Sequence, residues 1–140
     1  MGKYVAEHIV KGLIRCGKTI KGSRVAVLGF AFKENCQDTR NTKVIDIIRE
    51  LGEYGVEVTV ADDVADAQEA RQLYGIDVVR LEDMGKSDAV AVCVQHDIFR
   101  GLTPGWFGGL YKGSQKLLFD LKGMYDRQEF INAGYYYWRL

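Results

Sequence analysis

The chain has 140 residues, 47% of them hydrophobic, which predicts one compact domain with a substantial core. Its 19 basic and 19 acidic residues cancel, and because no basic stripe or aromatic-interleaved cationic face is present, we do not expect it to bind nucleic acid. The longest apolar runs have the length of a strand and the N-terminus lacks the apolar core of a signal peptide, so we expect no membrane span and a cytoplasmic location.

Helical patterns and strand-like apolar runs alternate along the chain. In chain order we expect a helix at residues 4–16, a strand at 24–28, a helix at 43–54, a strand at 56–60, a helix at 65–74, strands at 77–79, 89–94 and 117–121, a short helix at 126–133 and a strand at 135–138. Continuous apolar strands in alternation with helices are typical of a parallel sheet covered on both faces. The sequence therefore predicts an α/β fold, a Rossmann-like doubly wound parallel sheet of five or six strands.

The first helix stands apart from this pattern. It precedes the first strand and carries a strong apolar face of its own, which has to be buried somewhere. We interpret it as the end of a helix that belongs to a neighbouring domain. The expected division is therefore residues 1–20 as the end of a linking helix and residues 21–140 as the sheet domain.

The three cysteines, Cys16, Cys36 and Cys93, are odd in number and widely spaced. Because no CxxC pair is present, we expect neither a metal site nor a disulfide framework. Cys93 lies in an apolar run and is interpreted as a core residue. Cys36 lies in a polar loop, where an incidental role is favoured over that of a nucleophile.

The loop after the first strand is the most informative segment. It carries two cations, Lys33 and Arg40, and leads into the N-terminus of the next helix. Strand, loop and helix in this order place phosphate groups at the carboxyl edge of a parallel sheet, within reach of ammonium, guanidinium and backbone N–H groups. The alternative is a solvated loop in which these cations pair with Glu34 and Asp38.

The dinucleotide-binding fingerprint is missing from this loop. Only Gly29 follows the strand, and Phe30 and Phe32 occupy the space that a pyrophosphate needs for close approach to the backbone. Asp62, at the end of the second strand, resembles a ribose-binding acid, but with Asp63 it is equally a helix N-cap pair. Without the glycines, we favour the cap.

Two further groups follow predicted strands. Lys122 comes just after the fifth strand and could join Lys33 around one anion, although it could also be an ordinary solvated lysine. His96 and Asp97 follow the fourth strand, where we expect Asp97 to cap a short helix and His96 to line the same edge without a proton-transfer role. No Ser-His-Asp order or pair of carboxylates indicates catalysis.

Residues 21–41, with the run Phe-Lys-Glu-Asn…Asp-Thr-Arg-Asn, closely resemble the start of the C-terminal domain of nucleotide-sugar dehydrogenases. This family comprises the UDP-glucose, UDP-N-acetylhexosamine and GDP-mannose dehydrogenases, and the run points to the UDP-N-acetylhexosamine branch. Residues 95–99, 119–126 and 137–140 agree with it, so the resemblance covers nearly the whole chain.

The resemblance implies a UDP-sugar 6-dehydrogenase that oxidises a sugar C6 hydroxyl to a carboxylate in two NAD-dependent steps, for polysaccharide biosynthesis. It implies that Phe32, Lys33 and Lys122 contact the UDP-sugar and that Arg40 reaches the cofactor phosphates. NAD and the catalytic cysteine belong to the family's other domains, so this chain carries no catalytic residue and we expect it to be inactive alone. The full-length enzyme is expected to be a homo-oligomer.

Two alternatives stay open beside this reading. The chain could be a stand-alone nucleotide-binding regulatory module, which would need micromolar affinity from these 140 residues alone. It could also serve mainly as a dimer surface through its first helix. One departure from the family pattern is Gln37, which stands where the motif often has proline and indicates a looser loop.

Overall fold

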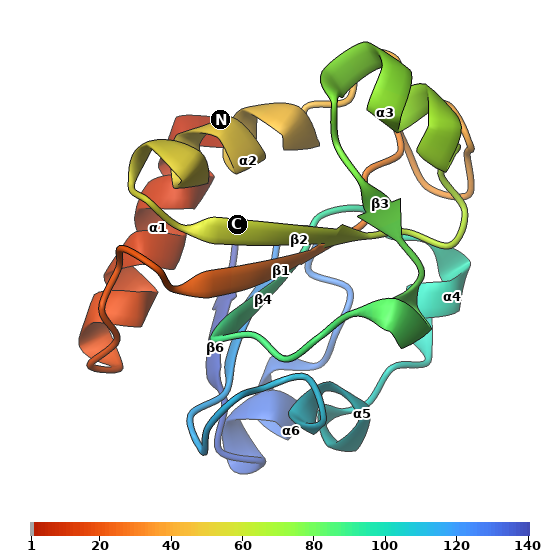
Figure 1. Cartoon of the computed structure of the whole chain (residues 1–140). Coiled ribbons are helices and arrows are strands. Elements are labelled where there is room, and N and C mark those ends of the chain that lie inside the picture. The colour runs from red at the N-terminus through yellow and green to blue at the C-terminus, as the bar shows by residue number, and fades with distance from the viewer. Residues whose placement is uncertain (1) are drawn as a thin grey trace.

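The computed structural model describes residues 2–140 and contains one sheet with helices on both of its faces (Figure 1). The strands are β1 (Arg24–Leu28), β2 (Glu57–Ala61), β3 (Val78–Val79), β4 (Ala89–Val92), β5 (Leu117–Asp120) and β6 (Tyr136–Arg139). The helices are α1 (Gly2–Arg15), α2 (Val44–Glu53), α3 (Ala67–Tyr74), α4 (Asp97–Arg100), α5 (Pro104–Gly108) and α6 (Arg127–Asn132), with a 3₁₀ turn η1 (Leu81–Asp83). The expected α/β fold, with a sheet of five or six strands, is confirmed, and the sheet has six.

The sheet is parallel throughout, in the order β3-β2-β1-β4-β5-β6. The chain moves outward from β1 to β3 and then crosses back to place β4 on the other side of β1. Leu28, the last residue of β1, pairs with Ala61 of β2 and with Val92 of β4, so the loops that follow these strands leave from one edge. Sheets of this kind bind ligands at the carboxyl edge where the strand order reverses, which here lies between β1 and β4.

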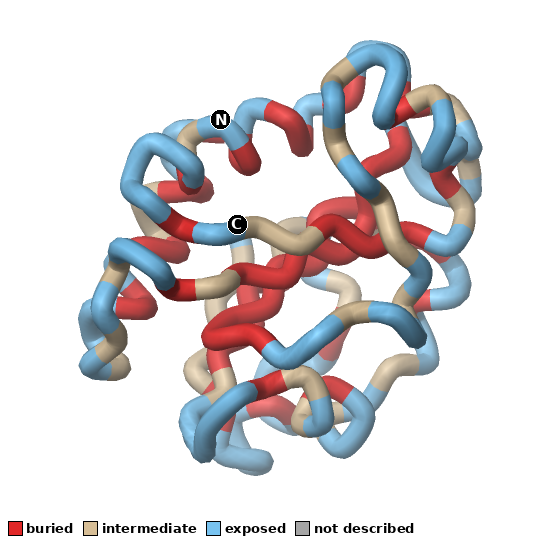
Figure 2. The backbone as a smooth tube through the Cα atoms, viewed as in Figure 1, coloured by how far each residue is buried: buried red, intermediate tan, exposed pale blue. Residues whose placement is uncertain are grey.

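The central strands are buried on both faces, as their continuous apolar character predicts. Every residue of β4 and β5 is buried, and Figure 2 shows the buried backbone running through the middle of the molecule. Helices α1 and α2 contribute to the hydrophobic cluster on one face. On the other face α4, α5 and α6 each insert one buried phenylalanine, respectively Phe99, Phe107 and Phe130.

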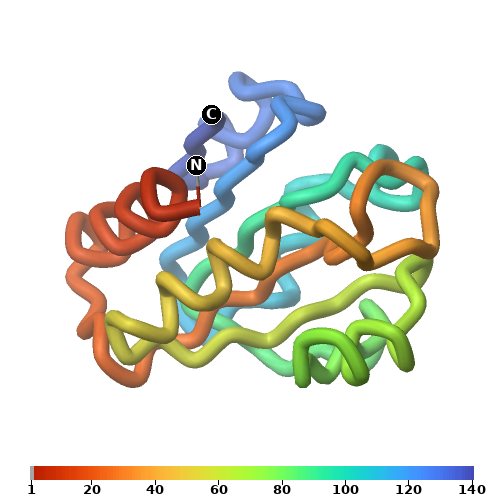
Figure 3. Tube along the Cα trace, turned by 90° about the horizontal axis from the view of Figure 1, so that it is seen from above, coloured from red at the N-terminus to blue at the C-terminus, as the bar shows by residue number. Residues whose placement is uncertain are grey.

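Helix α1 covers the sheet of this same chain. Its side chains Val5, Ile9 and Leu13 are fully buried. The helix lies beside α2 (Figure 3). His8 stacks on Trp138 of β6, with ring centroids 5.0 Å apart. A Cβ on Gly12 would lie 2.7 Å from the Phe119 ring, so this turn of α1 packs directly on β5. The apolar face of α1 therefore needs no neighbouring domain to cover it, contrary to the argument from the sequence; the division at residue 20 stays a prediction.

The differences from the expected elements concern the ends of strands and helices, together with the short helix α5 and the turn η1, which were not among the expected elements. β4 stops at Val92, and Cys93 and Val94 belong to the loop after it. Asp97 is the first residue of α4 and His96 takes the N-cap position, so Asp97 does not cap this helix as expected. Among residues 2–140, no helix is long and apolar enough to cross a membrane.

Candidate functional site

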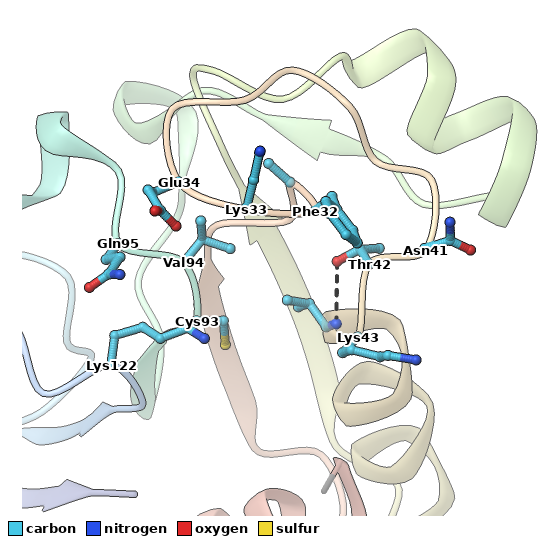
Figure 4. A pocket seen from close by; sticks show the side chains of 12 residues that line it. Phe32, Lys33, Glu34, Asn41, Thr42, Lys43, Cys93, Val94, Gln95 and Lys122 are labelled. Carbon is cyan, nitrogen blue, oxygen red and sulfur yellow. Dashed lines mark hydrogen bonds between the residues drawn. The ribbon is translucent and has the colours of Figure 1, made fainter.

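A pocket of about 190 Å³ opens at the carboxyl edge of the sheet, where the strand order reverses (Figure 4). Its walls come from the loop between β1 and α2 and from the segments that follow β4 and β5. The lining residues are Ala31, Phe32, Lys33, Glu34, Asn41, Thr42, Lys43, Val44, Cys93, Val94, Gln95 and Lys122. Three of the four residues expected to bind ligand, Phe32, Lys33 and Lys122, thus line one pocket although they come from loops about ninety positions apart.

The charge of the pocket is mainly positive. Lys33, Lys43 and Lys122 line it with one carboxylate, Glu34, and none of these lysines forms a salt bridge within the described part of the chain. Lys122 extends toward Cys93, whereas Lys33, on the loop between β1 and α2, points away from Lys122 (Figure 4). Because both side chains are exposed and flexible, they can adjust to an anion that enters between them.

The N-terminus of α2 forms another part of the wall. Thr42, Lys43 and Val44 line the pocket, and the N–H of Val44 donates to Thr42 Oγ1 at 3.3 Å. The Lys43 side chain makes no hydrogen bond that caps the helix. The positive end of the helix dipole therefore lies at the rim of a pocket that already carries lysines.

Arg40 lies apart from this pocket. Its guanidinium forms a two-pronged contact with Asp38, with Nε 3.0 Å from Oδ1 and Nη2 2.9 Å from Oδ2. This hydrogen-bonded guanidinium lowers the pKa of Asp38 to about 2. The two residues line a separate open hollow together with Gln37, Asp66 and Glu69. Arg40 thus forms the solvated ion pair that was the alternative to ligand binding. The contact of Arg40 with a cofactor stays a prediction.

Asp62 is a buried hub that holds the start of the β1–α2 loop. Its Oδ2 accepts from the N–H groups of Phe30, at 2.7 Å, and Ala31, at 3.2 Å, while Oδ1 accepts from Val64 and Ala65. The expected helix cap is wrong, because Asp66 caps α3 by accepting from the N–H of Glu69. Burial alone would raise the pKa of Asp62, but hydrogen bonds from His96 and the backbone outweigh it and lower that pKa.

His96 connects Asp62 to the far part of the same loop. The ring is fully buried, with Nε2 2.9 Å from Asp62 Oδ2, and Nδ1 accepts from the N–H of Asn35 at 2.8 Å. Asn35 has a left-handed backbone with φ of 57°, and its Oδ1 accepts from the N–H of Asp97 at 2.9 Å. His96 therefore lies at this edge as expected, but it is buried beneath the loop and does not line the pocket. The sequence did not indicate Asn35, although asparagine is one of the few residues that adopts a left-handed conformation readily.

A second buried carboxylate holds the turn that carries Lys122. Asp120 is fully buried, its Oδ2 accepts from the N–H of Tyr125 at 3.0 Å, and the hydroxyl of Tyr137 donates to the same oxygen. Arg139 donates to the carbonyl of Tyr125 and to the hydroxyl of Tyr137 at 2.6 and 2.9 Å. The last strand therefore fixes the turn on one side of the pocket.

Gly29 and Cys93 contribute packing where the loops after β1 and β4 meet. Gly29 has φ of 97°, and a Cβ there would lie 2.6 Å from Val94 Cβ, so glycine is needed where the loops after β1 and β4 meet. Burial raises the pKa of Cys93 to about 12, which keeps its thiol protonated and unreactive. The interpretation of Cys93 as a core residue is confirmed, since its side chain is buried.

Comparison with known proteins supports the resemblance found in the sequence. Residues 26–127 match the model of the UDP-glucose/GDP-mannose dehydrogenase family, UDP binding domain. The chain is 40% identical over its whole length to protein CapL of Staphylococcus aureus, and 42% identical over 122 residues, 87% of the chain, to the UDP-N-acetyl-D-glucosamine 6-dehydrogenase of Salmonella typhi. It covers 32% and 28% of these relatives, so it spans about a third of their length.

A solved structure agrees with the fold. The NDP-N-acetyl-D-galactosaminuronic acid dehydrogenase of Methanosarcina mazei Go1 matches 99% of this chain with a TM-score of 0.88 and 25% identity, through 28% of its own chain. The expected resemblance to the nucleotide-sugar dehydrogenases, and to their UDP-N-acetylhexosamine branch, is confirmed.

Proposed function

The chain belongs to the UDP-glucose/GDP-mannose dehydrogenase family, as its UDP-binding domain, and on that premise we propose that its carboxyl-edge pocket holds the UDP part of a UDP-sugar. The observation that carries the proposal is the meeting of Phe32, Lys33 and Lys122 around one pocket at the reversal of strand order. Lysine ammonium groups and a helix N-terminus suit a diphosphate, and the exposed ring of Phe32 suits a flat base or a ribose.

In this proposal the chain contributes binding and not chemistry. The parent protein would be an NAD-dependent UDP-sugar 6-dehydrogenase that oxidises the C6 hydroxyl of a UDP-N-acetylhexosamine to a carboxylate, for polysaccharide biosynthesis. Its catalytic cysteine would come from another part of that protein. We further propose that the parent enzyme is cytoplasmic and homo-oligomeric.

NAD does not fit the loop after β1 in this chain. The N–H groups of Phe30 and Ala31, which a dinucleotide pyrophosphate would need, already donate to Asp62. The side chain of Val94 fills the space beside Gly29. The cofactor would therefore be held mainly by the rest of the parent protein, with the exposed Arg40 reaching its phosphates from outside the pocket.

Calorimetric titration of the 140-residue chain with UDP, with uridine as the matched control, tests this function. Because the proposed site is half of a shared pocket, we expect weak binding of UDP, in the millimolar range, and none of uridine, which lacks the diphosphate. Equal binding of the two ligands would contradict a site built for the diphosphate. Micromolar binding of UDP would instead favour a stand-alone nucleotide-binding module.

A further inference from the structure

The loop that carries Phe32 and Lys33 has little regular structure, so its position depends on a few hydrogen bonds. At its start, Phe30 and Ala31 donate to Asp62. The N–H of Phe32 donates to the carbonyl of Asp38 across the loop at 2.7 Å. Beyond Lys33, the next anchor to the body of the domain is the contact between Asn35 and His96.

We propose that His96 is a positioning residue for nucleotide binding, because it latches this loop by accepting the N–H of Asn35 at Nδ1. The proposal rests on the function proposed above. It assigns a task to a histidine that is fully buried and does not line the pocket.

The hydrogen-bond partners of His96 define which ring nitrogen carries the proton. Nδ1 receives the backbone N–H of Asn35, so it has to present a lone pair. Nε2 faces Oδ2 of Asp62, an acceptor, so it has to carry the hydrogen. The neutral Nε2–H form satisfies both contacts, and Asp62 thereby fixes the ring with its acceptor turned toward the loop.

The latch holds the backbone at Asn35, two residues beyond Lys33. Asn35 holds a left-handed conformation and is tied twice, through its N–H to His96 and through its Oδ1 from the N–H of Asp97. Since the Asn35 side chain is exposed, packing does not hold it in place. Loss of the latch would remove one of the two ties that hold Asn35, and with it part of the support for Phe32 and Lys33 at the pocket.

Two substitutions separate the two ends of the imidazole. In His96→Asn the amide oxygen takes the place of Nδ1, so the latch to Asn35 is kept while the donor to Asp62 is lost. In His96→Gln the longer amide reaches the place of Nε2, so the donor to Asp62 is kept while the latch is lost. The affinity of each 140-residue variant for UDP is measured by calorimetry and its stability by urea denaturation.

A latch predicts that the Gln variant binds UDP about tenfold more weakly than the wild type and that the Asn variant stays within about threefold. It also predicts the opposite order for stability, because the Asn variant removes the side-chain donor of the buried Asp62 carboxylate and leaves that group with backbone donors alone. If affinity follows stability, so that the Gln variant binds better than the Asn variant, His96 serves only to satisfy Asp62 and the proposal is overturned.

Two measurements on the unmodified chain need no folded variant. The latch predicts slow hydrogen exchange for the Asn35 amide and an imidazole ¹⁵N spectrum with the proton on Nε2. Exchange at the rate of an open loop, or a proton on Nδ1, would overturn the proposal. If the unmodified chain shows both features but fails to bind UDP, the latch stands and the proposed function fails.

Discussion

Replacement of Lys33 or Lys122 by alanine in the 140-residue chain should weaken UDP binding without affecting the fold. Both side chains line the same pocket from different loops, both are exposed, and neither is engaged in a salt bridge in residues 2–140. An ammonium about 4 Å from a phosphate charge gains roughly 4 kcal/mol at an effective dielectric constant of 20, before desolvation. Exposure to water and salt removes most of this gain, and about 1.4 kcal/mol, or about tenfold in Kd, is expected to remain per lysine.

The double variant tests whether the two lysines hold one ligand independently. If the losses add, they amount to about a hundredfold, so a chain that binds UDP in the millimolar range should show no measurable binding as the double variant. The control is Lys11→Ala, which removes the same charge from an exposed position on α1 outside the pocket and should leave the Kd unchanged. Calorimetry at low and at physiological salt measures the effect, which should shrink as salt screens the charges. If Lys11→Ala weakens binding as much as Lys33→Ala, the interaction is a diffuse effect of net charge and the reasoning is refuted. In the parent enzyme proposed above, Lys33→Ala should raise KM by about tenfold or more.

Three further predictions concern the residues that shape the pocket. Asp62→Ala leaves the buried donors of Phe30, Ala31 and His96 without an acceptor. Urea denaturation should show a free energy of unfolding lower by about 3 kcal/mol or more. A loss below about 1 kcal/mol would mean that water replaces the carboxylate. Folding lowers the pKa of Asp62, so the unfolded chain binds this proton at a higher pH than the folded chain does. The stabilisation is therefore complete above the unfolded pKa of about 4 and is lost as the pH falls through the folded pKa. In this acidic range the free energy of unfolding should fall less steeply with pH in Asp62→Ala than in the wild type. Gly29→Ala forces a left-handed backbone onto alanine and pushes its Cβ against Val94, so thermal unfolding should show a loss of about 2 kcal/mol; a variant as stable as the wild type would show that the two loops separate freely.

The fold could be predicted from the sequence because its signals are local. Continuous apolar runs located the strands, and the alternation with helices gave the parallel sheet. The place of α1 could not be predicted in the same way. An amphipathic pattern shows that one face of a helix is buried, but it does not show which surface covers it, and here α2 and the sheet do so.

The candidate site could be predicted only in part. Lys33 and Lys122 were found because cations after strand ends point to the carboxyl edge of a parallel sheet. The hub of Asp62 was missed because its partners Phe30 and His96 lie more than thirty positions away in the sequence. For Arg40 the sequence offered two possibilities, a ligand contact or an ion pair with Asp38 two residues away, and only the structure shows that the ion pair forms outside the pocket.

Chemical-shift mapping by ¹H–¹⁵N NMR tests the central claim, which is that Lys33 and Lys122 bind the diphosphate of one nucleotide at the edge of the sheet. Titration of the 140-residue chain with UDP should move the amide signals of Phe32, Lys33 and Lys122 together, while the signals of the Arg40 hollow stay in place. Spectra unchanged at millimolar UDP, or shifts gathered on another face of the sheet, would contradict the account.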